Sequence, residues 1–403
     1  MSKYLKLSRH CEIVEGRTGA MLYDFKNKKA YHVEKEESEK LRMLQKGSSV
    51  ERVCGKNIQM QHFIEQMLKE EVATLQEEWT PSERTHKGQL YELHPENRIS
   101  LNKIFIELPG KCTEDCELCG ETMINGCYSC NRPTKMEFDK FYYFRLISEI
   151  AVYRFENIYF HGGNLFLQTD NLKEILEYTR RLVGRDINIF VICDKRHILK
   201  EMEEFLKRLN ILLIVGIECR NKSSEEILLE IEETIFTVEK TLGIINLKID
   251  VENMESFSNL GEKMITHVFS KIIFSLRYHG EAEKLEYFSC MPKIISDEAT
   301  FFFLEKIHPC LAGTLSVSSD GKVYPCPEIK DFIGIIDYGV NKTFSKIFDN
   351  REEIMKYWCL GIEKINTCKE CEYRKTCSDC RALDYSLGNI NEKCVCSKGK
   401  SSR

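Results

Sequence analysis

Short apolar runs recur through the middle of the chain, and segments with helical spacing separate most of them. The runs are KIFIELP, NIYFHGG, INIFVIC, LLIVGIE, INLKIDV and KIIFSLR, which begin at Lys103 and end at Arg277. Helical spacing is present around 137–153, 170–184, 196–208, 223–241 and 255–268. This alternation predicts an α/β domain over residues 103–280, with a parallel sheet forming a partial (β/α)6 barrel of the TIM type. Functional groups are then expected at the carboxyl ends of the strands.

The pattern of residues 1–80 predicts a smaller unit, in which strands come first and helices follow. CEIVEG, AMLYDF and KAYHVE are short strand patterns, and helical stretches follow near 35–46 and 60–76. The unit resembles the winged-helix-like domains that recognise leader peptides by pairing an exposed strand edge with them. A plain structural extension is the alternative. The polar segment 81–102 has turn residues and no clear period, which indicates a linker.

The tail, residues 281–403, shows little periodic apolar pattern and is rich in cysteine, glycine and short turns. Such a region cannot bury much core by itself, so metal clusters are expected to supply cross-links. Within it, SVSSDGKVYPC predicts a hairpin with an Asp-Gly turn, which would bring Cys310 and Cys326 to one end.

Composition narrows the class of protein. The 403 residues carry a formal net charge of −5 with acids and bases mixed along the chain, so there is no basic stripe for nucleic acid. The beginning of the chain lacks an apolar signal segment, and the longest apolar runs, such as ILLIVGI, are too short to span a membrane. We therefore expect a cytoplasmic protein with neither nucleic acid nor membrane as a partner.

Nineteen cysteines are unusual for a reducing compartment, where clustered thiols bind metal or do redox chemistry. One group lies at 112–130 and another at 290–396. The remaining cysteines are scattered, and we expect them to be small core residues. They are Cys11, Cys54, Cys193 and Cys219.

A three-cysteine loop directly follows the first predicted strand of the sheet. In KCTEDCELCG, three and then two residues separate Cys112, Cys116 and Cys119. Three thiolates on one tight loop can hold three corners of a 4Fe-4S cluster and leave the fourth iron open for a ligand. A zinc site completed by Cys127 and Cys130 is the alternative, although structural zinc usually takes four ligands from paired knuckles. The spacing is similar to the signature of radical S-adenosylmethionine (SAM) enzymes, which implies that SAM binds the open iron.

The second predicted strand ends in IYFHGGNLFL, which resembles the stretch that holds the methionine end of SAM in radical SAM enzymes. Gly162 and Gly163 allow the backbone to approach a ligand closely. Asn164 stands where the family usually has glutamate, and its amide can still accept a hydrogen bond from the SAM ammonium. The resemblance also makes Asp194 and Arg220 candidates for binding SAM, with surface salt bridges as the alternative.

The cysteines of the tail resemble the SPASM domain, which holds auxiliary clusters in radical SAM peptide maturases. Two adjacent zinc ribbons are the alternative. By resemblance, the cluster near the barrel takes Cys290, Cys310, Cys326 and Cys380. The distal cluster takes Cys368, Cys371, Cys377 and Cys394. Some relatives leave the position of Cys290 open for a substrate thiolate, and Cys359 or Cys396 could substitute elsewhere.

The resemblance covers the chain from Lys103 onwards and implies a peptide maturase with three 4Fe-4S clusters. Such an enzyme cleaves SAM reductively and abstracts a hydrogen from a ribosomally synthesised precursor peptide, installing a cross-link such as a thioether. It also implies flavodoxin or ferredoxin as the electron donor, and the tail is most similar to maturases found beside ATP-grasp ligases. An anaerobic sulfatase-type maturase, which forms formylglycine, and a non-catalytic zinc-binding scaffold are the alternatives.

Overall fold

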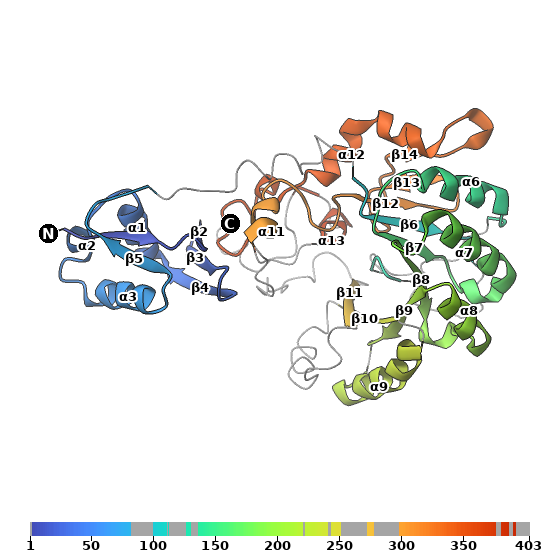
Figure 1. Cartoon of the computed structure of the whole chain (residues 1–403), viewed down its shortest axis with the longest axis horizontal. Coiled ribbons are helices and arrows are strands. Elements are labelled where there is room, and N and C mark those ends of the chain that lie inside the picture. The colour runs from blue at the N-terminus through green and yellow to red at the C-terminus, as the bar shows by residue number, and fades with distance from the viewer. Residues whose placement is uncertain are drawn as a thin grey trace.

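The structure, a computed structural model, is dominated by one large sheet. It describes residues 2–81, 100–110, 112, 126–129, 136–220, 222–240, 243–250, 272–277, 298–375, 380–386 and 390–391. The strand order is β11-β10-β9-β8-β7-β6-β12-β13-β14, so the sheet is open over the described residues (Figure 1). Six strands are parallel to their neighbours and match the six predicted runs. They are β6 (Lys103–Glu107), β7 (Asn157–His161), β8 (Asn188–Asp194), β9 (Ile211–Glu218), β10 (Ile244–Asp250) and β11 (Ile272–Arg277).

Helices connect these strands, as the spacing predicts. They are α6 (Lys140–Ile150), α7 (Thr169–Val183), α8 (Glu203–Arg208) and α9 (Ser224–Lys240), with the 3-10 turns η1 (Leu165–Gln168), η2 (Lys195–His197) and η3 (Lys200–Met202). The helix expected around 196–208 is α-helical only over Glu203–Arg208, and the 3-10 turns η2 and η3 come before it. The helix expected around 255–268 lies outside the residues that the structure describes.

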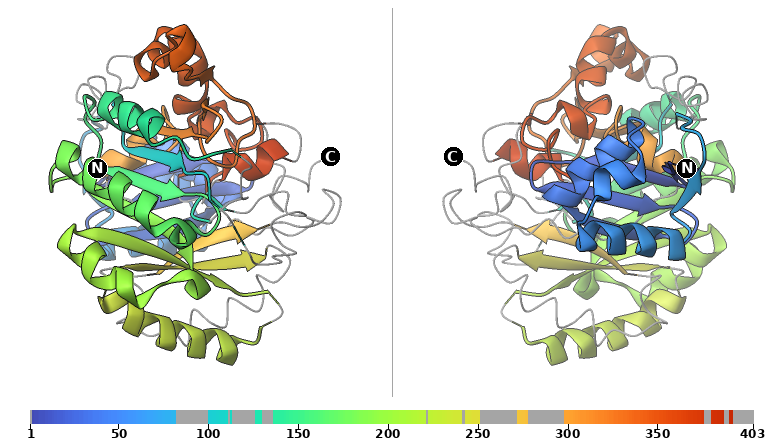
Figure 2. Two further views of the ribbon diagram at one scale, coloured as in Figure 1. Left: turned by 90° about the vertical axis from the view of Figure 1, so that its right-hand side faces the viewer. Right: turned by 90° about the vertical axis from the view of Figure 1, so that its left-hand side faces the viewer.

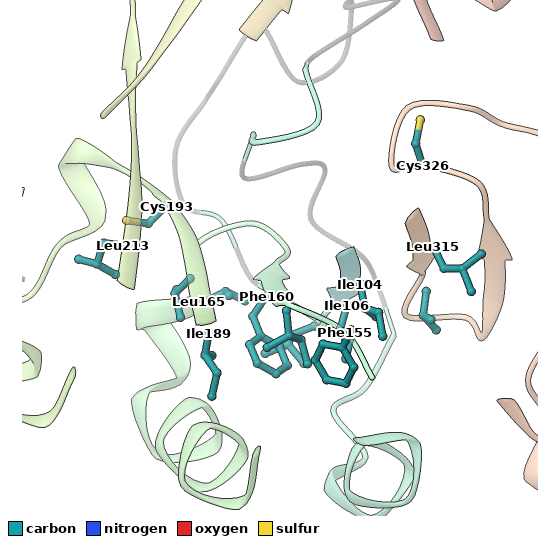
Figure 3. Packing of buried hydrophobic residues seen from close by; sticks show 14 of the residues in the cluster. Ile104, Ile106, Phe155, Phe160, Leu165, Ile189, Cys193, Leu213, Leu315 and Cys326 are labelled. Carbon is teal, nitrogen blue, oxygen red and sulfur yellow. The ribbon is translucent and has the colours of Figure 1, made fainter. Parts of the chain in front are cut away.

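The main core lies between the sheet and these helices, because alternate residues of each strand point to that side. Ile104, Ile106 and Phe160 are fully buried there, as Figure 3 shows from close by. The residues between them point to the opposite side, which we call the inner face. A second apolar cluster lies on it and is built mainly from aromatic and branched side chains. Its buried members are Phe105, Tyr159, Phe190, Ile192 and Ile214.

The tail extends the same sheet. β12 (Thr314–Val317) pairs in parallel with β6, and β13 (Lys322–Tyr324) and β14 (Gly334–Ile335) follow it antiparallel. The hairpin predicted for SVSSDGKVYPC is therefore confirmed, with its strands at Thr314–Val317 and Lys322–Tyr324. The tail buries apolar side chains against the rest of the sheet, since Phe344 and Trp358 are at most 1 % exposed and join the main core. The tail's helices are α11 (Glu298–Phe303), α12 (Arg351–Trp358) and α13 (Arg381–Ser386), with 3-10 turns η7 (Tyr338–Val340), η8 (Phe344–Asp349) and η9 (Ile362–Lys364).

The N-terminal unit has its own sheets and core. β2 (Cys11–Glu15), β3 (Gly19–Asp24) and β4 (Lys29–Glu34) form the predicted antiparallel meander. Helices α1 (Lys35–Gln45), α2 (Val50–Cys54) and α3 (Ile58–Lys69) cover it. The helix expected near 60–76 is too long, because the chain turns at Glu71, with φ of 58°, and then forms β5 (Ala73–Gln76). β5 pairs with β1 (Tyr4–Leu7), a strand that the pattern did not predict.

The β2–β3 turn of this unit contacts the tail near Cys371. The backbone N–H of Arg17 donates to the carbonyl of Glu370 at 3.0 Å, and Arg374 donates to the carbonyl of Glu15 at 2.8 Å. The two views of Figure 2 present helices α6 and α7 from one side and the N-terminal unit from the other. No helix in the described part of the chain is both long and apolar enough to cross a membrane.

Candidate active site

The first residues of the three-cysteine loop lie directly against the paired glycines. The backbone N–H of Leu108 donates to the carbonyl of His161 at 2.7 Å. A Cβ on Gly110 would lie 1.6 Å from the carbonyl oxygen of Gly162, and a Cβ on Gly162 would lie 1.9 Å from that of Leu108. Only glycine allows this approach, which is helped by the positive φ of Gly162 (132°) and Gly163 (56°). The two loops that follow β6 and β7 are thus held together by backbone contact.

Of the three loop cysteines, the structure describes Cys112, which is partly buried and lies just beyond this contact. Cys116 and Cys119 lie outside the described residues, as does Gly120, which stands where radical SAM enzymes usually have an aromatic residue. Their role as ligands stays a prediction.

Asn164, which the sequence predicts to contact SAM, also caps a 3-10 turn. Its Oδ1 accepts a hydrogen bond from the N–H of Phe166 at 3.1 Å, so it caps η1, and the residue is only 8 % exposed. An amide oxygen has two lone pairs, so one can remain available to a ligand. Its contact with a cofactor stays a prediction.

Polar side chains occupy the carboxyl-terminal half of the inner face. Registers place them at similar heights on adjacent strands, with Glu107 opposite His161 and Lys248 opposite Ser275. Toward the other ends of the strands, the same face carries the apolar cluster around Phe105. We call this set the polar inner row. It consists of Glu107, His161, Asp194, Glu218, Asn246, Lys248 and Ser275.

Asp194 and Lys248 form a buried ion pair in this row. Lys248 Nζ lies 3.9 Å from Asp194 Oδ2, and the two side chains are 5 % and 9 % exposed. A Cβ on Gly216 would lie 2.7 Å from Lys248 Cε, so the lysine side chain crosses the strand between them at a glycine. Burial would raise the pKa of Asp194, but hydrogen bonds from Arg196 and the charge of Lys248 outweigh it and hold the pKa below its ordinary value.

Burial also sets the protonation of two other members of the row. It lowers the pKa of His161 to about 4, so this imidazole is neutral near pH 7. It raises the pKa of Glu107, although Ser319 opposes the shift by donating from its backbone and its hydroxyl. Over the described residues, Asn246 Oδ1 and Ser275 Oγ are buried without a hydrogen-bond partner. The row thus combines fixed charges with polar atoms that a ligand could satisfy.

Tyr128 closes part of the inner face. Its ring centroid lies 5.9 Å from that of Phe105 and 5.5 Å from that of Tyr159. Its carbonyl accepts a 2.8 Å hydrogen bond from Asn246 Nδ2. The short segment 126–129 is therefore fixed inside the sheet's inner face.

The other predicted residues are distributed as follows. Arg220 follows β9 and is exposed. In the tail, Cys310 is exposed, Cys326 and Cys368 are buried, and Cys371 and Cys380 are intermediate. Cys290, Cys377 and Cys394 lie outside the described residues. The four scattered cysteines, Cys11, Cys54, Cys193 and Cys219, are all buried, as expected of core residues.

Sequence reasoning missed most of the polar inner row. A usable signal was present in β10, where Asn246 and Lys248 alternate with Ile245, Leu247 and Ile249. Polar residues at every second position of an otherwise apolar strand indicate a second, polar face. Glu107 and His161 are weaker cases, because each is a single polar residue at a strand end.

No protein-family model matches the sequence, and no curated protein matches it. Among solved structures, SuiB of Streptococcus suis is similar over 97 % of this chain and 99 % of its own, at 12 % identity and a TM-score of 0.45. Native anSMEcpe with bound AdoMet is similar over 72 % of this chain and 92 % of its own, at 14 % identity and a TM-score of 0.47. Likeness at this level gives no information on activity, so a function has to be argued from the residues.

Proposed function

We propose that this protein is a radical SAM peptide maturase. The observation that carries the proposal is the backbone contact between Gly110 and Gly162. It places the start of the Cys112 loop against the paired glycines, at the carboxyl end of a parallel sheet. Ligand sites in parallel α/β sheets are found at this edge. The polar inner row lies beside it.

Three thiolates of the loop, from Cys112, Cys116 and Cys119, would hold a 4Fe-4S cluster that supplies reductive cleavage of the SAM sulfonium. The chain's own residues would bind and orient. Gly162 and Gly163 expose backbone groups to the methionine end of the cofactor. Lys248 offers a positive charge, and Asn246 and Ser275 offer buried polar atoms. The apolar cluster around Phe105 on the inner face would exclude water from a reactive ligand.

A peptide substrate is supported by the N-terminal unit. In its meander, β3 is central, and β4 has no second partner strand within the described residues. A strand with one open edge can pair with an extended peptide through its backbone groups. We infer that residues 1–80 bind the leader of a ribosomally made precursor, and that the barrel at 103–280 and the tail at 281–403 act on the remainder.

The finer points of the proposal follow the sequence resemblance. The product is a cross-link such as a thioether, the tail holds two auxiliary clusters, and flavodoxin or ferredoxin supplies electrons. The enzyme would work in the cytoplasm, where its thiols stay reduced, in a system that can include an ATP-grasp ligase.

Iron analysis and SAM cleavage test the proposal together. Three clusters correspond to about twelve iron atoms per chain in anaerobically purified protein. Replacing Cys112, Cys116 and Cys119 by alanine should remove about four of them and abolish SAM cleavage. The matched control is Cys193→Ala, which alters a buried core cysteine. Colourless protein that holds only zinc, or SAM cleavage that persists in the triple variant, would overturn the proposal.

A further inference from the structure

Three side chains of different chemistry meet at one end of the β2–β3 hairpin, away from the turn that contacts the tail. Cys11 begins β2 and is paired directly with Asp24, the last residue of β3, so both side chains lie on one face of the meander. His10 immediately precedes Cys11. The imidazole, the thiol and the carboxylate each place a ligand atom within 4.8 Å of the other two. We call these three residues the hairpin triad.

Hydrogen bonds fix two members of the triad. The carbonyl of His10 accepts a 2.9 Å hydrogen bond from the N–H of Phe25, and this bond closes the end of the hairpin. Asn27 holds the carboxylate of Asp24, because its backbone N–H donates to Oδ1 at 3.1 Å and its Nδ2 donates to Oδ2 at 2.7 Å. Carboxylates that bind metals are usually oriented by hydrogen bonds of this kind. The triad is therefore held in position by its own surroundings.

Asp24 is a carboxylate that is completely buried, at 0 % exposure. Lys29 lies directly opposite Asp24 in the register, yet its ammonium pairs with Glu70 at 3.6 Å. Over the residues that the structure describes, His10 is the one basic side chain within ion-pair distance of Asp24. A buried carboxylate is stabilised by an ion pair or by a metal ion. The lysine beside it does not supply that charge.

His10 does not satisfy Asp24 by a hydrogen bond. Its Nε2 lies 3.7 Å from Asp24 Oδ1, beyond the ~3.2 Å limit of an ordinary N–H···O bond. The His10 side chain is 29 % exposed, but Nε2 itself is buried and has no hydrogen-bond partner among the described residues. Two ligands of one tetrahedral zinc ion, with bonds of ~2.0–2.3 Å, lie about 3.3–3.6 Å apart. The observed separation is close to that of two ligands of one ion.

We propose that His10, Cys11 and Asp24 form a zinc site in the N-terminal unit. Zinc accepts nitrogen, sulfur and oxygen ligands together, whereas magnesium and calcium take oxygen ligands. The thiolate and the carboxylate supply two negative charges, which a divalent cation neutralises. Three protein ligands leave the fourth position of a tetrahedral ion to water. The ion ties the start of β2 to the end of β3, so Cys11 does more than fill the core.

Hydrogen exchange of the full-length protein, prepared anaerobically, tests the site without a variant. Zinc bound by the triad should slow exchange of the Phe25 backbone amide, because this amide donates to the carbonyl of His10. EDTA should reverse the effect, and added zinc should restore it. The amide of Gln61, which donates to the carbonyl of Asn57 at 3.1 Å, is the internal control and should not respond. An exchange rate of Phe25 that is the same with zinc and with EDTA would overturn the proposal.

Variants of the triad then show which residues hold the ion. Cys11→Ala and His10→Gln should each lower the zinc content by about one atom per chain and abolish the zinc response of Phe25. Because His10 is partly exposed, His10→Gln tests the site even if Cys11→Ala fails to fold. The matched control is Cys54→Ala, which removes another buried cysteine of the same core. A zinc content that falls equally in the control, or in none of the variants, would refute the ligand set.

Asn27→Ala provides an intermediate case. It removes the Nδ2 bond to Asp24 and leaves all three ligands in place, so zinc affinity should fall by roughly 10–100-fold without loss of the site. A zinc titration followed at the Phe25 amide measures this affinity, with His62→Gln as the control at an exposed histidine. Equal zinc affinity in these two variants would contradict the assignment of Asp24 as a ligand.

The zinc site does not rest on the proposed function, and the same samples show whether either fails. Iron content and SAM cleavage are measured beside the zinc response of Phe25. A zinc response in protein without iron or SAM cleavage supports the site and contradicts the function. Iron and SAM cleavage in protein without a zinc response support the function and overturn the site.

Discussion

The carboxylate of Glu107 accepts two hydrogen bonds from Ser319, at 2.9 Å from the backbone N–H and at 3.2 Å from the hydroxyl. The two residues are 212 positions apart in the chain. Glu107 ends β6, where the three-cysteine loop begins, and Ser319 lies in the turn of the hairpin that carries Cys310 and Cys326. The carboxyl-terminal edge of the large sheet and the tail are therefore joined at a defined point.

Substituting Gly162 should weaken SAM binding and leave the sheet intact. In Gly162→Ala, the new Cβ would meet the carbonyl of Leu108 at 1.9 Å, so the loops after β6 and β7 must separate. Equilibrium dialysis with SAM should show at least a tenfold loss of affinity, about 1.4 kcal/mol. The control is Gly184→Ala, where φ is also positive (72°) but no atom lies within 4 Å of the added Cβ. Equal SAM affinity in both variants would contradict the assigned contact.

The buried pair Arg381–Asp384 should be far more important for stability than an exposed pair of the same spacing. Arg381 and Asp384 are at most 1 % exposed, and removing one buried partner costs roughly 3–5 kcal/mol. Asp384→Asn should therefore lower the free energy of unfolding strongly in a denaturant titration. Glu353→Gln removes a partner of Lys356 in an exposed pair and should cost less than about 1 kcal/mol. Similar losses of unfolding free energy in the two variants would contradict the greater importance assigned to the buried pair.

The free energy of unfolding should decrease as the pH is lowered, because of His161. Its folded pKa is about 4 and its unfolded pKa about 6.5, so the unfolded chain binds the proton more readily. Above about pH 6.5, His161 is neutral in both the folded and the unfolded chain and does not lower the free energy of unfolding. As the pH falls from 6.5 toward 4, the unfolded chain binds the proton first, and the free energy of unfolding decreases by up to about 3 kcal/mol. His161→Gln should flatten the dependence of the unfolding free energy on pH in this window. His62→Gln, at an exposed histidine, serves as the control. An unchanged slope in His161→Gln would refute the prediction.

The contact between the N-terminal unit and the tail should depend on Gly16. A Cβ there would lie 2.4 Å from the backbone nitrogen of Glu372, so Gly16→Ala should push the β2–β3 turn away from the tail. Hydrogen exchange of the Arg17 backbone amide should rise, because its hydrogen bond to the carbonyl of Glu370 would lengthen. Gly339→Ala is the control, since the added Cβ meets only the side chain of Asp337, at 3.2 Å. Unchanged exchange would show that the turn is not held by this contact.

The sequence predicts β6 to β11 of the large sheet well, because each is a mainly apolar run bounded by turns. It predicts short and half-polar strands poorly. β1 and β5 contain YLKL and ATLQ, and their pairing depends on a chain reversal through the whole N-terminal unit. Local pattern does not report such a distant partner.

The residues of the candidate site also differ in how well the sequence predicts them. Gly162 and Gly163 can be recognised in the sequence because they directly follow the second predicted strand, after the strand that precedes the cysteine loop. Cys127 is visible only as a member of a CxxC pair. The packing of Tyr128, the next residue, against Phe105 and Tyr159 is a tertiary contact that no local pattern reports. The ion pair of Asp194 with Lys248 likewise needs the strand order β8-β9-β10, with Gly216 in between.

The parallel pairing of β12 with β6 has a consequence for how the protein is made. During translation, β6 emerges from the ribosome long before β12, so one edge of β6 stays unpaired while about two hundred further residues are added. An unpaired strand edge can form hydrogen bonds with other chains. Expression at a lower temperature, or with chaperones that shield nascent strands, should therefore increase the yield of native protein.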